Sequence, residues 1–415
     1  MRTQGLSAYI AVTAAYWAFM LTDGALRMLV LLHFHTLGFS PIQLAWLFLL
    51  YEFMGMVTNL SAGWIAARFG LTATLYAGLG IQIVALIMLA QLDPAWALVT
   101  SVIYVMVVQG ASGVAKDLAK MSSKSAVKLL APTENGGLFK WVAWLTGSKN
   151  AIKGLGFLLG TLLLGAFGFT SSVLIMAAVL GAILLGIAMF MPSGLPRGKK
   201  GAKFSEVFSK DPNINWLSAA RMFLFGARDV WFVVGIPIYF YAVLSDGTDA
   251  GNRATFFLIG TFMAFWIIAY GAVQAWAPSM LKAREKTDAE ITRLATRWVG
   301  ALSLIPLTLA IAAWAANGPA SWLTHTLIVG LMLFGFVFAV NSSLHSYLIL
   351  AFTRSDRVTM DVGFYYMSNA AGRLLGTLLS GLSYQAGGLP LCLATAGAMA
   401  GLSFVIAKKL TKQSA

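Results

Sequence analysis

Charged residues are scarce in this 415-residue chain, since only 11% of its positions carry Asp, Glu, Lys or Arg, whereas about 25% is usual for a soluble globular protein. Acidic residues are especially few: 15 stand against 29 Lys and Arg, and the formal net charge is +14. A basic balance can indicate nucleic-acid binding, but here the charges form short clusters between long apolar runs. This pattern predicts a polytopic membrane protein with no nucleic-acid partner.

Cysteine and histidine are also rare. The single cysteine, Cys392, excludes a disulfide framework and any site that one chain builds from several thiolates. Four scattered histidines offer neither a set of metal ligands nor a nucleophile–base pair, and no G-x-x-x-x-G-K-[ST] stretch is present to bind ATP phosphates. We therefore expect a protein that is not an enzyme, has no catalytic residues and holds no metal or other cofactor.

Apolar runs dominate the sequence instead. A helix needs about 20 mostly apolar residues to cross about 30 Å of hydrocarbon at about 1.5 Å per residue. Twelve runs meet this length, and the first is too long for a cleavable signal peptide. The expected fold is an all-α membrane protein with twelve transmembrane helices, near 7–33, 41–66, 72–91, 95–116, 138–167, 170–191, 214–243, 254–278, 297–316, 320–351, 358–384 and 388–407.

Basic residues occur at alternate ends of these runs. One set of ends carries 22 Lys and Arg, and the opposite set carries Arg253 alone. Because cytoplasmic loops are enriched in Lys and Arg, both termini are expected in the cytoplasm. Attraction to lipid headgroups explains the basic series that begins at Lys116 and Lys120 and recurs every four residues.

An internal repeat predicts two related halves. The segment Leu158–Gly165 returns as Leu374–Gly381 with seven of eight residues identical at an offset of 216. At the same offset Arg68 falls on Arg284. We expect two pseudo-symmetric six-helix halves, residues 1–191 and 214–415, joined by a cytoplasmic linker at 192–213.

Charged groups inside the apolar runs indicate where the function lies, since each costs about 2.5–3.5 kcal/mol at the bilayer centre. Apart from Lys and Arg within three residues of a run's end, the runs hold six cations and four acids: Arg27, Lys149, Lys153, Arg221, Arg228, Arg373, Asp23, Glu52, Asp229 and Asp361. Arg221 lies near the cytoplasmic end of its run, where a side chain that reaches the membrane surface explains it. Arg grips phosphate-like or carboxylate oxygens bidentately, whereas Lys acts as a point charge. The cationic excess therefore predicts a water-accessible site for a multiply charged anion. Its candidate substrate-binding residues are Arg27, Lys149, Lys153, Arg228, Arg373, His345, Asn369 and Tyr365.

The acids suggest energy coupling. A carrier that alternates between two openings changes both the solvation of a carboxylate and its distance from a cation, so the carboxylate can load and release a proton. Asp23 and Glu52 are the candidates for proton coupling. The competing interpretation is static pairing without a ligand, in which Asp23 neutralises Arg27 one turn away and Glu52 neutralises a lysine. Asp229 points about 100° away from Arg228 around a helix, so these two residues need not pair.

The turn Gly63–Gly70 resembles the signature G-x-x-x-D-R-x-G of the major facilitator superfamily, with Ala67 in place of the Asp. The resemblance implies twelve helices around a central cavity and a gating role for Gly63, Arg68 and Gly70, while Ala67 leaves the usual charge clasp incomplete. The glycine series from Gly154 to Gly165 resembles a motif of antiporter members without its proline, and close helix packing explains it equally.

Four segments closely resemble the organoarsenical efflux permease (ArsJ) family of that superfamily: Tyr16–Arg27, Leu31–Gly38, Lys116–Ser125 and Leu138–Asn150. The resemblance implies a bacterial cytoplasmic (inner) membrane protein that exports 1-arseno-3-phosphoglycerate and thereby confers arsenate resistance. The implied partners are this anionic substrate, protons, membrane lipids and glyceraldehyde-3-phosphate dehydrogenase, which makes the substrate from arsenate.

Two other cargoes stay open at this point. One is another organic phosphate or carboxylate, which the same cations would bind. The other is a hydrophobic cation, as in drug-type antiporters, but such a carrier needs an acidic cavity and the interior here is positive.

Overall fold

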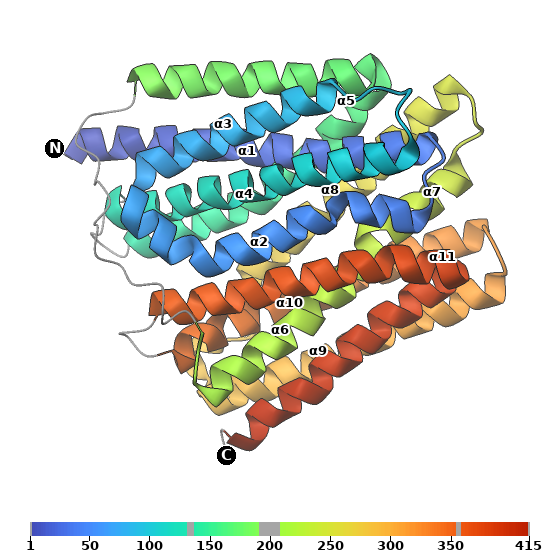
Figure 1. The fold of residues 1–415 in the computed structure, drawn as a ribbon. Helices are drawn as coiled ribbons and strands as arrows, with labels where there is room; N and C mark the ends of the chain where they lie inside the picture. The colour runs from blue at the N-terminus through green and yellow to red at the C-terminus, as the bar shows by residue number, and fades with distance from the viewer. Residues whose placement is uncertain (1, 131–136, 191–207, 354–357, 414–415) are drawn as a thin grey trace.

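A computed structural model describes residues 2–130, 137–190, 208–353 and 358–413, and all regular structure in these ranges is helical (Figure 1). A π-turn, η2 (Trp231–Gly235), joins α6 to α7, and a 3₁₀ turn, η3 (Ala283–Glu285), precedes α9. The helices are α1 (Arg2–Thr36), α2 (Pro41–Phe69), α3 (Leu71–Ala90), α4 (Leu98–Leu130), α5 (Gly137–Phe190), α6 (Pro212–Val230), α7 (Ile236–Leu244), α8 (Asp249–Met280), α9 (Asp288–Ala316), α10 (Ser321–Phe352) and α11 (Val358–Gln413).

Ten stretches in the described residues are long and apolar enough to cross a membrane. Two of them, in α5 and α11, contain 43 and 50 residues, about twice the length that one crossing needs. Both contain a non-helical break, at Gly168 in α5 and at Gly387–Gly388 in α11. Gly168 and Gly388 have φ values of 72° and 62°, a region that favours glycine. An all-helical membrane fold is therefore confirmed, and the number twelve stays a prediction.

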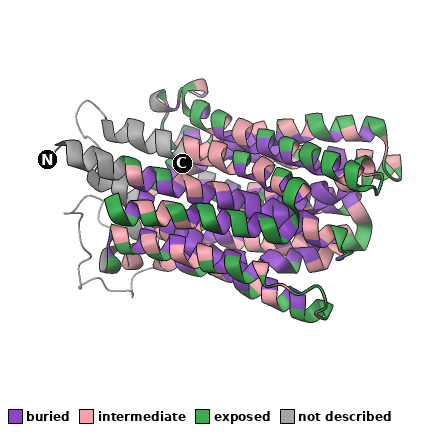
Figure 2. Cartoon of the chain, turned by 90° about the horizontal axis from the view of Figure 1, so that it is seen from above, coloured by how far each residue is buried: buried purple, intermediate pink, exposed green. Residues whose placement is uncertain are grey.

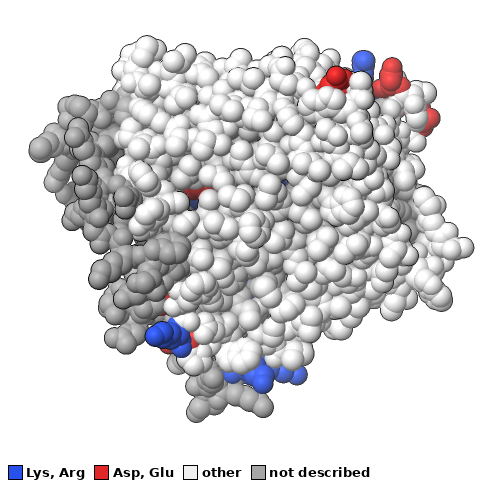
Figure 3. All heavy atoms as spheres, viewed as in Figure 1, with Lys and Arg blue, Asp and Glu red and all other residues white. Residues whose placement is uncertain are grey.

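The outer surface of the bundle is apolar. Large side chains such as Phe190 and Trp314 are 80% and 75% exposed. Charged atoms on the face in Figure 3 gather at two ends, and the broad middle is nearly free of them. Buried residues are concentrated between the helices (Figure 2). An exposed apolar surface of this extent fits contact with lipid rather than water.

The helices form two groups in space. Helices α1 to α5 pack mainly on one another, as do α6 to α11, and the groups meet where α2 packs on α11 and α5 packs on α8 (Figure 1). Helix α1 begins and α11 ends on the same side of the bundle (Figure 1). The exact boundaries of the halves and the orientation across the membrane stay predictions, and most of the linker at 192–213 lies outside the described residues.

Glycines of the internal repeat sit at two analogous helix contacts. In α5, a Cβ on Gly160 would collide with the backbone of Ala25 in α1. In α11, a Cβ on Gly376 would lie 2.6 Å from the Gly226 carbonyl oxygen and 2.9 Å from the Asp229 Cβ in α6. The absence of a side chain lets each pair of backbones approach closely, so the repeated sequence has the same packing role in both groups.

The Gly160 contact supplies a test. Gly160→Ala is expected to destabilise the protein by about 1–3 kcal/mol, because the added methyl group meets rigid backbone. The matched control is Gly181→Ala in the same helix, whose Cβ would meet nothing within 4 Å and which is expected to be neutral or stabilising by up to about 1 kcal/mol. Thermal unfolding in nanodiscs measures both. Equal stability of the two variants would contradict the close approach of α1 to α5.

Candidate functional site

The helical span that carries Arg228 and Asp229 is irregular just beyond them, in η2. Pro237, in the first turn of α7, has no N–H to offer the preceding turn. Two side chains of α11 bind the backbone of this region instead: the Ser380 hydroxyl accepts from one N–H at 3.1 Å, and the Cys392 thiol donates to one carbonyl at 3.1 Å. Such π-turns occur frequently at functional sites, and these two hydrogen bonds hold this one against α11.

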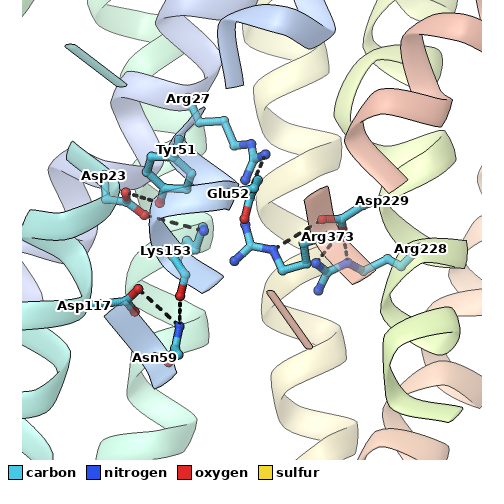
Figure 4. Close-up of polar contacts among 11 residues, drawn as sticks. Asp23, Arg27, Tyr51, Glu52, Asn59, Asp117, Lys153, Arg228, Asp229 and Arg373 are labelled. Atoms are coloured by element: carbon cyan, nitrogen blue, oxygen red, sulfur yellow. Dashed lines mark hydrogen bonds and ion pairs between the residues drawn. The ribbon is translucent and has the colours of Figure 1, made fainter. Parts of the chain in front are cut away.

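Glu52 of α2 is fully buried, and its described ion-pair partners are two arginines rather than the lysine of the alternative interpretation. Its Oε1 accepts hydrogen bonds from Arg27 of α1 at 3.1 Å and from Arg373 of α11 at 2.6 Å (Figure 4). Charge-assisted contacts of this kind are about twice as strong as neutral ones. Glu52 therefore ties the group α1–α5 to α11 through a single carboxylate oxygen.

Asp229 makes the corresponding bridge on the other side of Arg373. Its Oδ2 lies 3.3 Å from Arg373 Nε, and its Oδ1 accepts from Arg228 Nε at 2.6 Å. The expectation that Arg228 and Asp229 need not pair is thus overturned, because the arginine side chain is long enough to fold back around the helix. The Arg228 guanidinium also lies 5.0 Å from the centre of the Phe225 ring.

Asp23 binds across helices rather than along its own. Its Oδ2 lies 3.5 Å from Lys153 Nζ of α5, and its Oδ1 accepts from the Tyr51 hydroxyl at 2.5 Å (Figure 4). The alternative pairing with Arg27 along one face of α1 is wrong, because Glu52 supplies the partner of Arg27. Tertiary packing supplies Asp23 and Arg27 with partners from α2 and α5, so neither residue pairs with the other along α1.

A further ionic group lies between α2 and α4. Asp117 accepts from Thr58 at 2.6 Å and from Asn59 at 3.2 Å, and Lys120 lies 3.3 Å from its other oxygen. The Lys116 ammonium is buried 4.1 Å from the centre of the Tyr51 ring. Headgroup attraction therefore does not explain Lys116 and Lys120, which belong to the interior.

These contacts define what we call the central charge cluster. Among described residues it holds six cations and four carboxylates, an excess of two positive charges. The enclosed space beside Asp23, Arg27 and Tyr51 is only about 10 Å³, room for about one water molecule. The ion pairs of Arg27, Lys120, Lys153, Arg228 and Arg373 all lie within the cluster. Its members are Asp23, Arg27, Glu52, Lys116, Asp117, Lys120, Lys153, Arg228, Asp229 and Arg373.

The other predicted site residues lie elsewhere. Lys149 is half-buried in α5. His345 and Tyr365 are buried beside Arg221 in another group of polar residues, and Asn369 is half-buried one turn before Arg373. Their roles in binding stay predictions.

The predicted gating residues are only partly visible. Gly70 directly precedes α3 and has a φ of 79°, which a residue with a side chain rarely adopts. The surroundings of Gly63 and the side chain of Arg68 lie outside the described residues. Gating by these residues stays a prediction. Within the described part of the chain, no three His, Cys, Asp or Glu side chains are grouped as metal ligands.

Sequence reasoning left three contributors out of the site. Tyr51 stands next to Glu52, Asp117 directly follows the predicted run 95–116, and neither is among the predicted site residues. A carboxylate three residues before Lys120 on one helix was the available signal. Arg221 was treated as reaching toward the membrane surface, yet it is only 4% exposed and packs against α10 and α11.

Known proteins share the fold of this chain. A POT family transporter in complex with a thioalcohol-conjugated peptide superposes with a TM-score of 0.73 at 12% identity, covering 98% of this chain and 96% of the other. The same family in complex with 5-aminolevulinic acid gives 0.73 at 13%, with the same coverage. A point mutant of the nucleoside transporter NupG gives 0.69 at 17%, covering 98% and 99%. No family model and no curated protein sequence matches. The chain therefore shares its fold with these structures.

Proposed function

We propose that this protein is a secondary active transporter of the major facilitator type that exports an organic arsenate/phosphate polyanion, 1-arseno-3-phosphoglycerate, in exchange for protons and so confers arsenate resistance. In this proposal twelve helices form two six-helix halves in the bacterial inner membrane, with both termini in the cytoplasm. Glyceraldehyde-3-phosphate dehydrogenase supplies the cargo. The transporter fold and the sequence resemblance to organoarsenical permeases support the proposal.

The observation that carries it is the cationic excess of the central charge cluster. Arg27, Arg228 and Arg373 come from α1, α6 and α11, which belong to both groups of helices. Among the described residues, two carboxylates pair with them, Glu52 and Asp229. An oxyanion with several charges offers these guanidinium groups the bidentate geometry that they favour, whereas a hydrophobic cation would be repelled.

Alternating access follows from the same contacts. The Arg373–Glu52 contact links the two groups of helices, so a cargo that takes Arg373 from Glu52 removes that link and frees the helices to rock about the site. Exchange requires that proton and cargo are not carried in the same step, so the carboxylates take up protons in the return step without cargo, when the site opens to the other side and their solvation changes. Exchange of cargo for protons at Glu52 and Asp23 is the coupling that we propose.

The test uses inside-out vesicles that carry the purified protein, with the cargo made in place by glyceraldehyde-3-phosphate dehydrogenase and arsenate. We expect uptake of arsenophosphoglycerate to exceed that of 3-phosphoglycerate and of arsenate. An acidic lumen should increase accumulation about tenfold per pH unit for each proton exchanged. Protein-free vesicles provide the control for leakage.

The outcomes separate the candidates. Faster uptake of 3-phosphoglycerate than of the arsenical favours the second candidate, a carrier for another organic phosphate or carboxylate, which the same cations would bind. Uptake that does not respond to the pH gradient removes proton coupling. A protein that moves none of the three anions in any gradient is not the proposed transporter.

A further inference from the structure

Arg221 is a buried cation outside the central charge cluster. It lies in α6 and is 4% exposed, and no described carboxylate pairs with it. One guanidinium nitrogen donates to the carbonyl and the hydroxyl oxygens of Ser342 in α10, both at 3.1 Å. Its Nε has no hydrogen-bond partner among the described residues. An uncompensated buried charge costs several kcal/mol, so its retention here points to a missing anion.

The surroundings of Arg221 are polar and incomplete. The Ser342 hydroxyl also accepts from Gln274 of α8 at 3.2 Å. His345, one turn further along α10, is fully buried within electrostatic range of Arg221, and neither ring nitrogen has a hydrogen-bond partner in the described structure. A buried imidazole N–H without an acceptor is costly. Arg221 and His345 thus present unused donors in one place.

The distance between Arg221 and Arg228, a member of the central charge cluster, limits the length of an anion that could contact both residues. The guanidinium carbons of Arg221 and Arg228 lie 4.0 and 5.0 Å from the centre of the same Phe225 ring. They are therefore at most 9.0 Å apart, the sum of these two distances. The two residues are seven positions apart on α6, two turns, and so occupy one face of the helix. Two guanidinium groups at this separation match the two ends of a short dianion.

We infer that Arg221 and His345 form a second anion subsite, which binds one oxyanion end of the cargo while Arg228 and Arg373 bind the other. The inference rests on the proposed function and narrows it: the cargo carries two anionic groups, of phosphate or carboxylate type, joined by a short chain. The site is enclosed by α6, α8, α10 and α11 rather than open to lipid, so the anion is a transported solute and not a headgroup.

Proteoliposome uptake with two probes tests the subsite. The probes are 3-phosphoglycerate, which has a phosphate and a carboxylate, and glycerol 3-phosphate, which has only the phosphate. Arg221→Met is expected to raise KM for 3-phosphoglycerate about ten- to a hundred-fold, the effect of losing one or two charge-assisted hydrogen bonds. KM for glycerol 3-phosphate should change less than about twofold, since the single phosphate of this probe binds at Arg228 and Arg373 and the carboxylate of 3-phosphoglycerate is the group that binds at Arg221. His345→Asn should change KM in the same direction, by a smaller factor.

Stability distinguishes binding from a structural role. Without anion, Arg221→Met should unfold at the same temperature as the native protein or higher, because an apolar side chain replaces an uncompensated charge. Arg221→Lys should retain part of the preference for 3-phosphoglycerate. The matched control is Lys409→Met, which removes an exposed cation that lies 5.5 Å from the Trp216 ring centre and should leave both KM values unchanged.

Two results would overturn the subsite. One is an equal rise in KM for both probes, and the other is a fall in the unfolding temperature of the empty Arg221→Met protein. The proposed function fails differently, because the native protein then transports neither probe. A native protein that carries both probes equally well, with Arg221→Met indistinguishable from it, removes the subsite and leaves the transporter intact.

Discussion

Arg373→Gln is expected to reduce anion transport at least about 100-fold while leaving expression normal. Arg373 contacts Glu52 at 2.6 Å and Asp229 at 3.3 Å, so it links α11 to α2 and α6, and in the proposed cycle it is also the group that the cargo takes. Removing one member of a buried charged contact costs about 2–5 kcal/mol, and each 1.4 kcal/mol corresponds to a tenfold change. Uptake of 3-phosphoglycerate into proteoliposomes measures the effect.

Two control variants test whether the effect of Arg373→Gln comes from the loss of any positive charge or from the loss of the guanidinium geometry. Arg253→Gln removes an exposed arginine from α8 and should transport normally. Arg373→Lys keeps the charge but loses the planar fork, so intermediate transport is expected. Arg27→Gln removes the other partner of Glu52 and should resemble Arg373→Gln. Normal transport by both glutamine variants would show that the cargo does not use these cations.

The helices of this fold follow from local sequence, which explains why they could be predicted. An apolar run of sufficient length has few alternatives to a helix in a bilayer, because every backbone polar group must be satisfied within the segment. The breaks near 168 and 387 fall at glycines, in the short gaps between predicted runs. The charge-poor outer surface likewise reflects composition alone.

The partners of the charges could not be predicted in the same way. Glu52 and Arg373 are 321 residues apart, and nothing local relates them. Spacing of four residues placed Asp23 and Arg27 on one face of α1, which is correct, but each binds a different helix. The choice depends on the distance between helix backbones, which glycines such as Gly376 set through tertiary contacts.

The position of Arg221 along its helix did not predict where its side chain points. Its place near the predicted cytoplasmic end of the run suggested a side chain that extends to the membrane surface. In the structure it points inward to Ser342 and Tyr365. Direction around the helix, rather than depth, decides whether an arginine meets solvent or the interior, and direction depends on which neighbours the helix acquires.

Glu52→Gln is expected to weaken the empty protein and to strengthen anion binding. Glu52 is fully buried and is the only described carboxylate that pairs with Arg27. Breaking a buried ionic contact from one side costs about 3–5 kcal/mol, because the remaining charge is uncompensated. The unfolding temperature without anion should therefore fall. Inorganic phosphate or 3-phosphoglycerate should recover most of this loss, since each supplies the missing negative charge.

Transport by Glu52→Gln should nevertheless be lost, because glutamine can neither take back the arginines nor carry a proton. Exposed Asp249→Asn, at the start of α8, is the control and should behave as the native protein does. Two measurements then separate the interpretations. A variant that binds phosphate more tightly than the native protein but transports no anion, with or without a pH gradient, identifies Glu52 as the competitor of the cargo. A variant with native stability and native transport would mean that Arg27 and Arg373 do not depend on Glu52, and competition between cargo and carboxylate could not drive the cycle.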